Sequence, residues 1–169
     1  TVAQEKPATA AKGKVLAERS YFAYFTGSLI GWQKMVRSEI QQDGKTRIRE
    51  DETSYFKISR DFDGLVIEIH GEAASIETPE GIPISKIDVS VNGTQTTRRS
   101  ATFGTESVTL TDTINDAKPV SYEISTKGLK VGSGNWAWNQ LKAGDRLKKG
   151  EVIEFDNLSM ESHVMERDS

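Results

Sequence analysis

Short turn dipeptides recur along the chain, and they constrain its fold more than any other feature. A glycine follows an acidic or amide residue at four closely spaced places, namely Asp43-Gly44, Asp63-Gly64, Glu80-Gly81 and Asn92-Gly93. Asp-Gly and Asn-Gly pairs favour the positive φ angles of two-residue type I′ hairpin turns. Because strands joined by such turns pair with their neighbours in the chain, the sequence predicts an antiparallel meander.

The stretches between the turns alternate apolar and polar residues, which is the period-2 pattern of strands with one wet face. In residues 28–42 the apolar row is formed by Ile30, Trp32, Val36 and Ile40. Similar stretches follow at residues 46–58, 65–77, 82–91, 107–114, 119–125 and 148–160, and a further strand is expected at residues 94–102. The predicted fold class is therefore mainly β: a single antiparallel, strongly curved meander sheet that forms an open or partly closed barrel.

Two segments differ from this pattern. One short helix is predicted near residues 135–143, where Trp138 and Leu141 follow an N-cap residue, Asn135, and precede a stop signal, Gly144. Residues 94–102 are rich in threonine and poor in apolar side chains, so we expect an exposed or edge strand there.

The length of the chain corresponds to one domain. With 169 residues it can bury roughly two-thirds of its unfolded surface and so form a core of its own. Residues 1–13 lack apolar periodicity, and we predict a flexible tail there, a single β domain over residues 14–160 and a polar C-terminal tail over residues 161–169. The absence of cysteine excludes disulfides and thiolate metal sites within the chain.

Charge and hydropathy limit the partners. The net charge of -3 provides no general attraction to phosphate, so no nucleic-acid partner is expected. No apolar run approaches the ~20 residues that cross a bilayer, so a membrane-spanning segment is not expected either. The small, polar, alanine-rich start TVAQEKPATAAKGK is typical of a tail left after signal-peptide removal and predicts export to the periplasm or the outside of the cell. A trimmed sequence would begin in the same way, and both explanations stay open.

One row of side chains suggests chemistry. Glu68 and Glu72 lie two positions on either side of His70 and so share its face of the strand. One imidazole and two carboxylates can bind a metal, and the same groups can form the acid/base pair of a hydrolase. A solvated strand face with cross-strand ion pairs has the same pattern, and no nucleophile elbow or phosphate-binding loop accompanies the row. We therefore predict no catalytic residue, no metal and no cofactor.

Aromatic residues stand in two groups, at Tyr21 to Trp32 and at Trp136 and Trp138. Aromatic clusters usually fill a core. The alternative is a concave apolar face, because a twisted sheet of many strands curls and offers a site for a ligand. On that alternative, Trp136 and Trp138 would gate the face. The predicted ligand-binding residues are Tyr24, Trp32, Trp136 and Trp138.

The order of segments resembles the amino-terminal β domain of secreted, planctomycete-type bacterial transglutaminase-like proteins. The resemblance covers roughly residues 20–158, as a pattern of spacing and turns. It is carried by Gly27, Ile30, Gly31 and Trp32, by Asp43-Gly44, by residues 53–60, and by the stretches TPEGIPISKIDVSVNG and LKAGDRLKKGEVIEF. The catalytic Cys-His-Asp set of that family belongs to a following domain. The resemblance therefore implies an exported β module without catalytic residues.

Three functions follow as hypotheses. The first is a non-catalytic, exported binding or scaffolding module whose concave sheet face takes a protein, lipid or glycan partner. The second is a hydrolase with an acid/base site around His70 and Glu68 or Glu72. The third is a structural subunit that assembles through an edge strand at residues 94–102.

Overall fold

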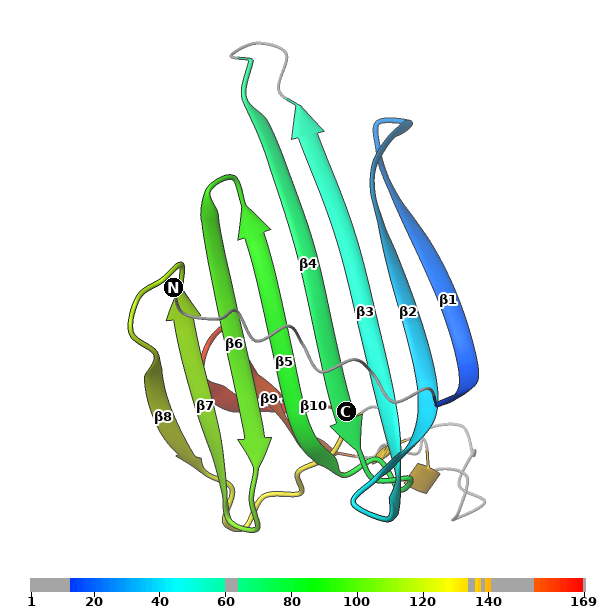
Figure 1. The fold of residues 1–169 in the computed structure, drawn as a ribbon, viewed down its shortest axis with the longest axis vertical. Helices are drawn as coiled ribbons and strands as arrows, with labels where there is room; N and C mark the ends of the chain where they lie inside the picture. Colours follow the sequence, from blue (N-terminus) through cyan, green and yellow to red (C-terminus); the bar gives the residue numbers. More distant parts are fainter. Residues whose placement is uncertain (1–12, 60–63, 134–135, 138, 141–153, 169) are drawn as a thin grey trace.

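A computed structural model describes residues 13–59, 64–133, 136–137, 139–140 and 154–168. Within these residues ten strands form two antiparallel sheets (Figure 1). The larger sheet holds β1 (Lys14–Phe25), β2 (Ser28–Gln42), β3 (Lys45–Ser59), β4 (Val66–Glu77), β5 (Pro83–Asn92), β6 (Gln95–Phe103), β7 (Ser107–Ile114) and β8 (Val120–Ser125). The smaller sheet holds β9 (Phe155–Ser159) and β10 (Val164–Asp168).

The predicted meander is confirmed, because the eight strands of the larger sheet lie side by side in chain order. Asp43 and Gly44 close the hairpin between β2 and β3 with φ angles of 52° and 70°, as a type I′ turn requires. Thr26 and Gly27 close the hairpin between β1 and β2 with φ angles of 47° and 84°. This second turn of the same kind was not predicted, since threonine rarely adopts positive φ.

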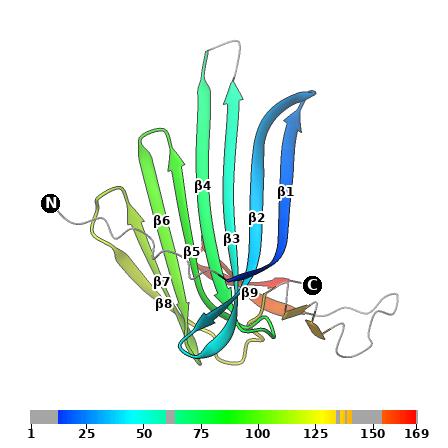
Figure 2. The same cartoon turned by 45° about the vertical axis from the view of Figure 1, so that its right-hand side comes forward.

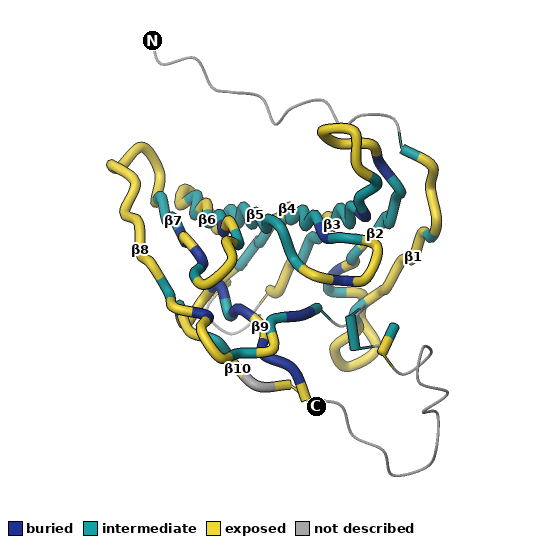
Figure 3. Tube along the Cα trace, turned by 90° about the horizontal axis from the view of Figure 1, so that it is seen from below, coloured by how far each residue is buried: buried dark blue, intermediate teal, exposed yellow. Residues whose placement is uncertain are grey.

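The larger sheet is curved and open, with β1 and β8 as its two unjoined edges. Turning the molecule shows how the long strands bend together (Figure 2). Seen from below, they trace an arc, and β9 and β10 lie inside it (Figure 3). We call the side that faces β9 and β10 the concave face, and the opposite side the convex face. The curved meander is confirmed, whereas strong curvature and the short helix are not.

The core lies between the two sheets rather than under the whole of the larger one. Its buried members are Ala101 of β6, Val108 and Leu110 of β7, and Leu158 and Met160 from β9 and its turn. Phe103, Ile124 and Met165 pack around them. No residue of β1 to β4 belongs to this cluster.

The prediction of an edge strand at residues 94–102 is wrong, because β6 lies between β5 and β7 and pairs with both. Its polar appearance has a simple cause. Ala101 and Phe103 are the residues of β6 that meet the core, while threonines such as Thr102 lie on the convex side of the strand, where the pleated surface suits β-branched side chains.

The aromatic residues near the start of the ordered chain are not core residues. Tyr24 and Phe25 are each 64% exposed, Phe22 is 61% exposed and Tyr21 is 47% exposed. Trp32 is exposed too, on the convex face of β2. These side chains are exposed because the core of the described chain lies towards the opposite edge of the sheet, against β6 and β7.

Two further expectations concern the C-terminal part. Residues 135, 138 and 141–143 of the predicted helix lie outside the described part of the chain. Ser133 makes the contact of an N-cap residue, because its hydroxyl accepts a hydrogen bond from the Trp136 amide at 3.3 Å. Residues 161–169, predicted to be a polar tail, include β10, which pairs with β9 from Val164 to Asp168.

Candidate binding face and its polar anchors

The concave face of β1 to β4 carries a set of apolar side chains away from the small sheet. Strand register decides which residues share this face, since side chains directly opposite each other in an antiparallel pair point to the same side. Phe56 lies opposite Ile69, and Ile58 opposite Ile67, on β3 and β4. Tyr21 of β1 lies opposite Gln33 of β2. Met35 comes two residues after Gln33 and therefore lies on the same face. Small residues, among them Gly71 and Ala73, leave room between these side chains.

A cleft of about 360 Å³ adjoins this surface where the sheet meets β9 and the segment around Ser133. Its walls combine small, apolar and charged side chains. They include Glu50, Glu52, Ala73, Ser75, Glu77, Lys86, Phe103, Ser133 and Asn157. Three carboxylates against one lysine make the cleft acidic, although Glu77 is engaged by an internal partner.

The pKa of the Glu50 carboxyl is shifted by its burial in the cleft and by the charges around it. Its pKa is raised above the ordinary value of 4.5, first because burial disfavours the charged form and then because Glu77 and Glu52 repel it. The nearby Arg37 guanidinium acts in the opposite direction and lowers the same pKa. The net upward shift means that the site favours a neutral group at this position.

We expect Glu50→Gln to raise the melting temperature at about pH 7 and to leave it unchanged at about pH 3. A carboxyl whose pKa is higher in the folded protein binds protons more tightly there, so stability falls as pH rises through the interval between the unfolded and folded pKa values. Below both values the carboxyl is protonated in both states, and the advantage of glutamine disappears. Thermal unfolding followed by circular dichroism measures this, with Glu123→Gln on exposed β8 as the control. A lower melting temperature at neutral pH would contradict the assignment.

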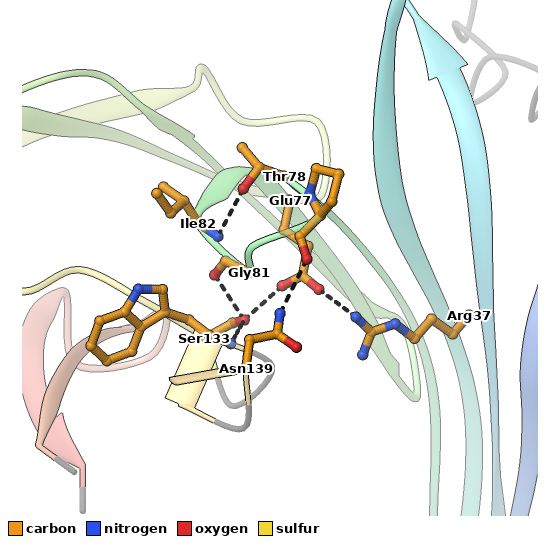
Figure 4. Close-up of polar contacts among 9 residues, drawn as sticks. Arg37, Glu77, Thr78, Gly81, Ile82, Ser133 and Asn139 are labelled. Carbon is orange, nitrogen blue, oxygen red and sulfur yellow. Dashed lines mark hydrogen bonds and ion pairs between the residues drawn. The ribbon is translucent and has the colours of Figure 1, made fainter. Parts of the chain in front are cut away.

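A buried ionic network closes the end of the cleft (Figure 4). The Glu77 side chain is 5% exposed and accepts a hydrogen bond from Arg37 Nη2 at 3.1 Å through one carboxylate oxygen. Through the other it accepts from the Ser133 hydroxyl at 2.6 Å. The Ser133 amide donates to the Gly81 carbonyl at 3.2 Å, and the Asn139 amide group donates to the Pro79 carbonyl at 3.1 Å. The network fastens the segment after Val131 to β2 and to the turn between β4 and β5.

A second polar cluster holds the small sheet in place. His163 lies in the turn between β9 and β10 at a positive φ of 58°, and its Nε2 is 2.7 Å from an oxygen of Asp112 on β7. Its ring packs on Tyr122 of β8, with ring centroids 4.7 Å apart. Arg99 of β6 faces the other Asp112 oxygen at 3.9 Å, which is too long for a hydrogen bond.

The structure does not bring the predicted ligand-binding residues together. Trp136 packs on Phe155, with ring centroids 6.1 Å apart, and against Gly132 at the cleft. Trp32 lies on the convex face and Tyr24 near the tip of the hairpin between β1 and β2. Trp138 lies outside the described residues. Of the four, Trp136 alone is placed beside the cleft.

The row around His70 lies on the convex face, away from the cleft. The His70 ring packs on Tyr55, with centroids 4.7 Å apart. Glu68 is bound to Lys57 of β3, with its oxygen 2.6 Å from Nζ, and this hydrogen bond lowers the pKa of the Glu68 carboxyl. Among the residues that the structure describes, no three His, Cys, Asp or Glu side chains lie together as metal ligands.

Comparison with models of protein families, with curated proteins and with solved structures finds no match. Within the described ranges, no helix has the length and apolar character to cross a membrane.

Proposed function

We propose that the protein is a non-catalytic, exported binding module whose concave sheet face takes a segment of a partner protein. One observation carries the proposal. The small sheet and the buried cluster occupy the concave side of β6 and β7, whereas the apolar concave residues of β1 to β4, such as Ile58 and Phe56, do not belong to the cluster. Exposed apolar surface beside a cleft is typical of a binding site.

The chemistry of the cleft favours a protein partner over a phospholipid surface. Glu50 and Glu52 would repel the phosphate of a lipid headgroup, and they would attract lysine or arginine side chains. Phe56 and Ile69 provide apolar surface for the uncharged side chains of the same segment. The expected ligand is therefore an extended segment that alternates apolar and basic residues. The resemblance to a β domain that accompanies an enzyme is consistent with such a role.

We expect Ala73→Arg to weaken binding of such a segment at least tenfold, or about 1.4 kcal/mol. Ala73 lines the cleft on the concave face of β4, so a long cation there fills the space and repels a basic ligand. The probe is an array of peptides graded in net charge, assayed beside a glycan array and zwitterionic vesicles. The matched control is Thr53→Arg, because Thr53 is exposed on the convex face of neighbouring β3 and adds the same charge.

Three results of the binding assay distinguish the alternatives. Binding of basic, apolar peptides that Ala73→Arg removes and Thr53→Arg keeps supports the proposal. Equal binding by both variants places the ligand elsewhere and overturns it. Signals confined to glycans or vesicles would overturn the choice of a protein partner.

A further inference from the structure

The first strand of the sheet is unusually apolar for an edge. Among the described residues sixteen large hydrophobic side chains are exposed, and six of them lie on β1. These six are Val15, Leu16, Tyr21, Phe22, Tyr24 and Phe25. They lie on both faces of the strand, since Tyr21 points to the concave side and Phe22 to the convex side. A partner on one face alone would leave half of them in water.

Among the described residues, none pairs with the outer edge of the β1 backbone. β1 is a terminal strand of twelve residues that pairs with β2 on one side, and no described segment pairs with it on the other. The opposite edge strand, β8, has only six residues and follows Pro119, which has no N–H to donate to an added strand. Natural proteins protect exposed edges by shortness, proline or charge, and the half of β1 from Ser20 to Phe25 has neither proline nor charge.

We propose that a second copy of this chain adds antiparallel to β1, about a two-fold axis perpendicular to the sheet. An added strand hydrogen-bonds the free edge and covers side chains on both faces at once. A lipid surface would instead leave the edge N–H and C=O groups without partners. With the axis in this direction both concave faces point the same way, and the two copies form one continuous sheet.

The charges on β1 select the register. A two-fold axis perpendicular to the sheet places one residue of β1 directly opposite the same residue of the other copy. If that residue were Arg19 or Glu18, two like charges would face each other. Choosing Ser20 places Arg19 opposite Tyr21 of the other copy, where a cation and an aromatic ring attract each other. Ser20 is also the midpoint of the regular stretch of β1 from Ala17 to Ala23, which lies between two register shifts.

The surface available on β1 is sufficient for a specific dimer. Tyr21, Phe22, Tyr24 and Phe25 are 47%, 61%, 64% and 64% exposed, respectively. With about 200 Å² for each aromatic side chain, these four alone offer roughly 500 Å² per copy, or about 1,000 Å² in the pair. That total approaches the ~1,200 Å² at which specific interfaces begin, and the exposed Val15 and Leu16 of each copy add to it.

The register has a direct test, because the chain contains no cysteine. Residues directly opposite each other in an antiparallel pair have Cα atoms about 4.5–5.5 Å apart, within the range that a disulfide spans. We expect Ser20→Cys to form a covalent dimer on mild oxidation, visible on a non-reducing gel. Ser121→Cys, which is exposed on the other edge strand β8, is the control and should remain a single chain. Equal cross-linking of the two variants would contradict the register.

The dimer itself is tested on the unmodified chain by light scattering. We expect twice the mass of one chain, and Phe22→Glu should raise the dimer dissociation constant at least tenfold, because the Ser20 register places this exposed position opposite Glu18 of the other copy, where two carboxylates repel each other. Thr113→Glu, which adds the same charge on the convex face of β7, should leave the dimer unchanged. A single-chain mass at every concentration overturns the proposal, as does binding of single chains to zwitterionic vesicles through β1. Neither result depends on whether the concave face binds a peptide.

Discussion

Leu110→Ala is expected to lower the free energy of unfolding by about 3–5 kcal/mol. Leu110 is fully buried on β7 and packs in the apolar cluster between the two sheets, together with Val108 and Leu158. Truncation removes the transfer free energy of the lost methyl groups and leaves a cavity that two β-sheets cannot easily collapse. Because the cluster is small, a single cavity affects most of the apolar packing between the sheets. Chemical denaturation followed by circular dichroism measures the change.

The matched control is the next residue along the strand. Thr111 points to the convex face, where its hydroxyl lies 2.9 Å from that of Ser121 in an exposed pair. Thr111→Ala is expected to cost less than about 1 kcal/mol, since it removes an exposed hydrogen bond and no core volume. If Leu110→Ala cost no more than Thr111→Ala, the small sheet would not be packed on β7.

The meander could be predicted because local signals and the global fold agree. Hairpin turns such as Asp43-Gly44 set which strands are neighbours, and period-2 alternation sets which side chains share a face. The same signals cannot say where in the sheet a core forms. Alternation marks Ile40 and Val108 alike as one-faced strand residues, and the small sheet that makes Val108 a centre of the core comes from a segment far along the chain.

The mistaken predictions share that cause. Residues 94–102 appear polar because the convex side of β6 carries Thr96, Arg98, Ser100 and Thr102, yet pairing with β5 and β7 depends on the order of strands and not on the apolar content of one strand. For the aromatic run from Tyr21 the sequence favours a core, because aromatics usually are buried, and leaves a concave binding face as the alternative. These side chains are exposed in β1 because no described segment packs on them. Whether a distant segment covers a strand cannot be read from the residues of that strand alone.

The polar anchors of the cleft were missed for a different reason. Glu77 and Ser133 are 56 residues apart in the chain, and Arg37 and Glu77 are 40 apart, so no local spacing connects them. One signal was present. Glu77 follows the run AASI, which has no charged residue, just before a Thr-Pro turn, and a carboxylate at such a place commonly has a buried partner.

The Glu77 network leads to the second large prediction, which is an asymmetry between its two charged members. Arg37→Met is expected to cost about 3–5 kcal/mol, because it removes the guanidinium within 3.1 Å of a carboxylate that is only 5% exposed. Glu77→Gln should cost less, about 1–3 kcal/mol. The Arg37 side chain that it leaves behind is 25% exposed and can be hydrated, and the glutamine can still accept a hydrogen bond from Ser133.

The double variant Arg37→Met with Glu77→Gln decides whether the asymmetry comes from an isolated buried charge. If it does, the double variant is more stable than Arg37→Met alone, because the carboxylate that had lost its cation is now neutral. Urea denaturation of all four proteins at one pH gives the coupling free energy. Equal losses in the two single variants, or a double variant that shows the plain sum of them, would mean that Arg37 and Glu77 act on stability independently.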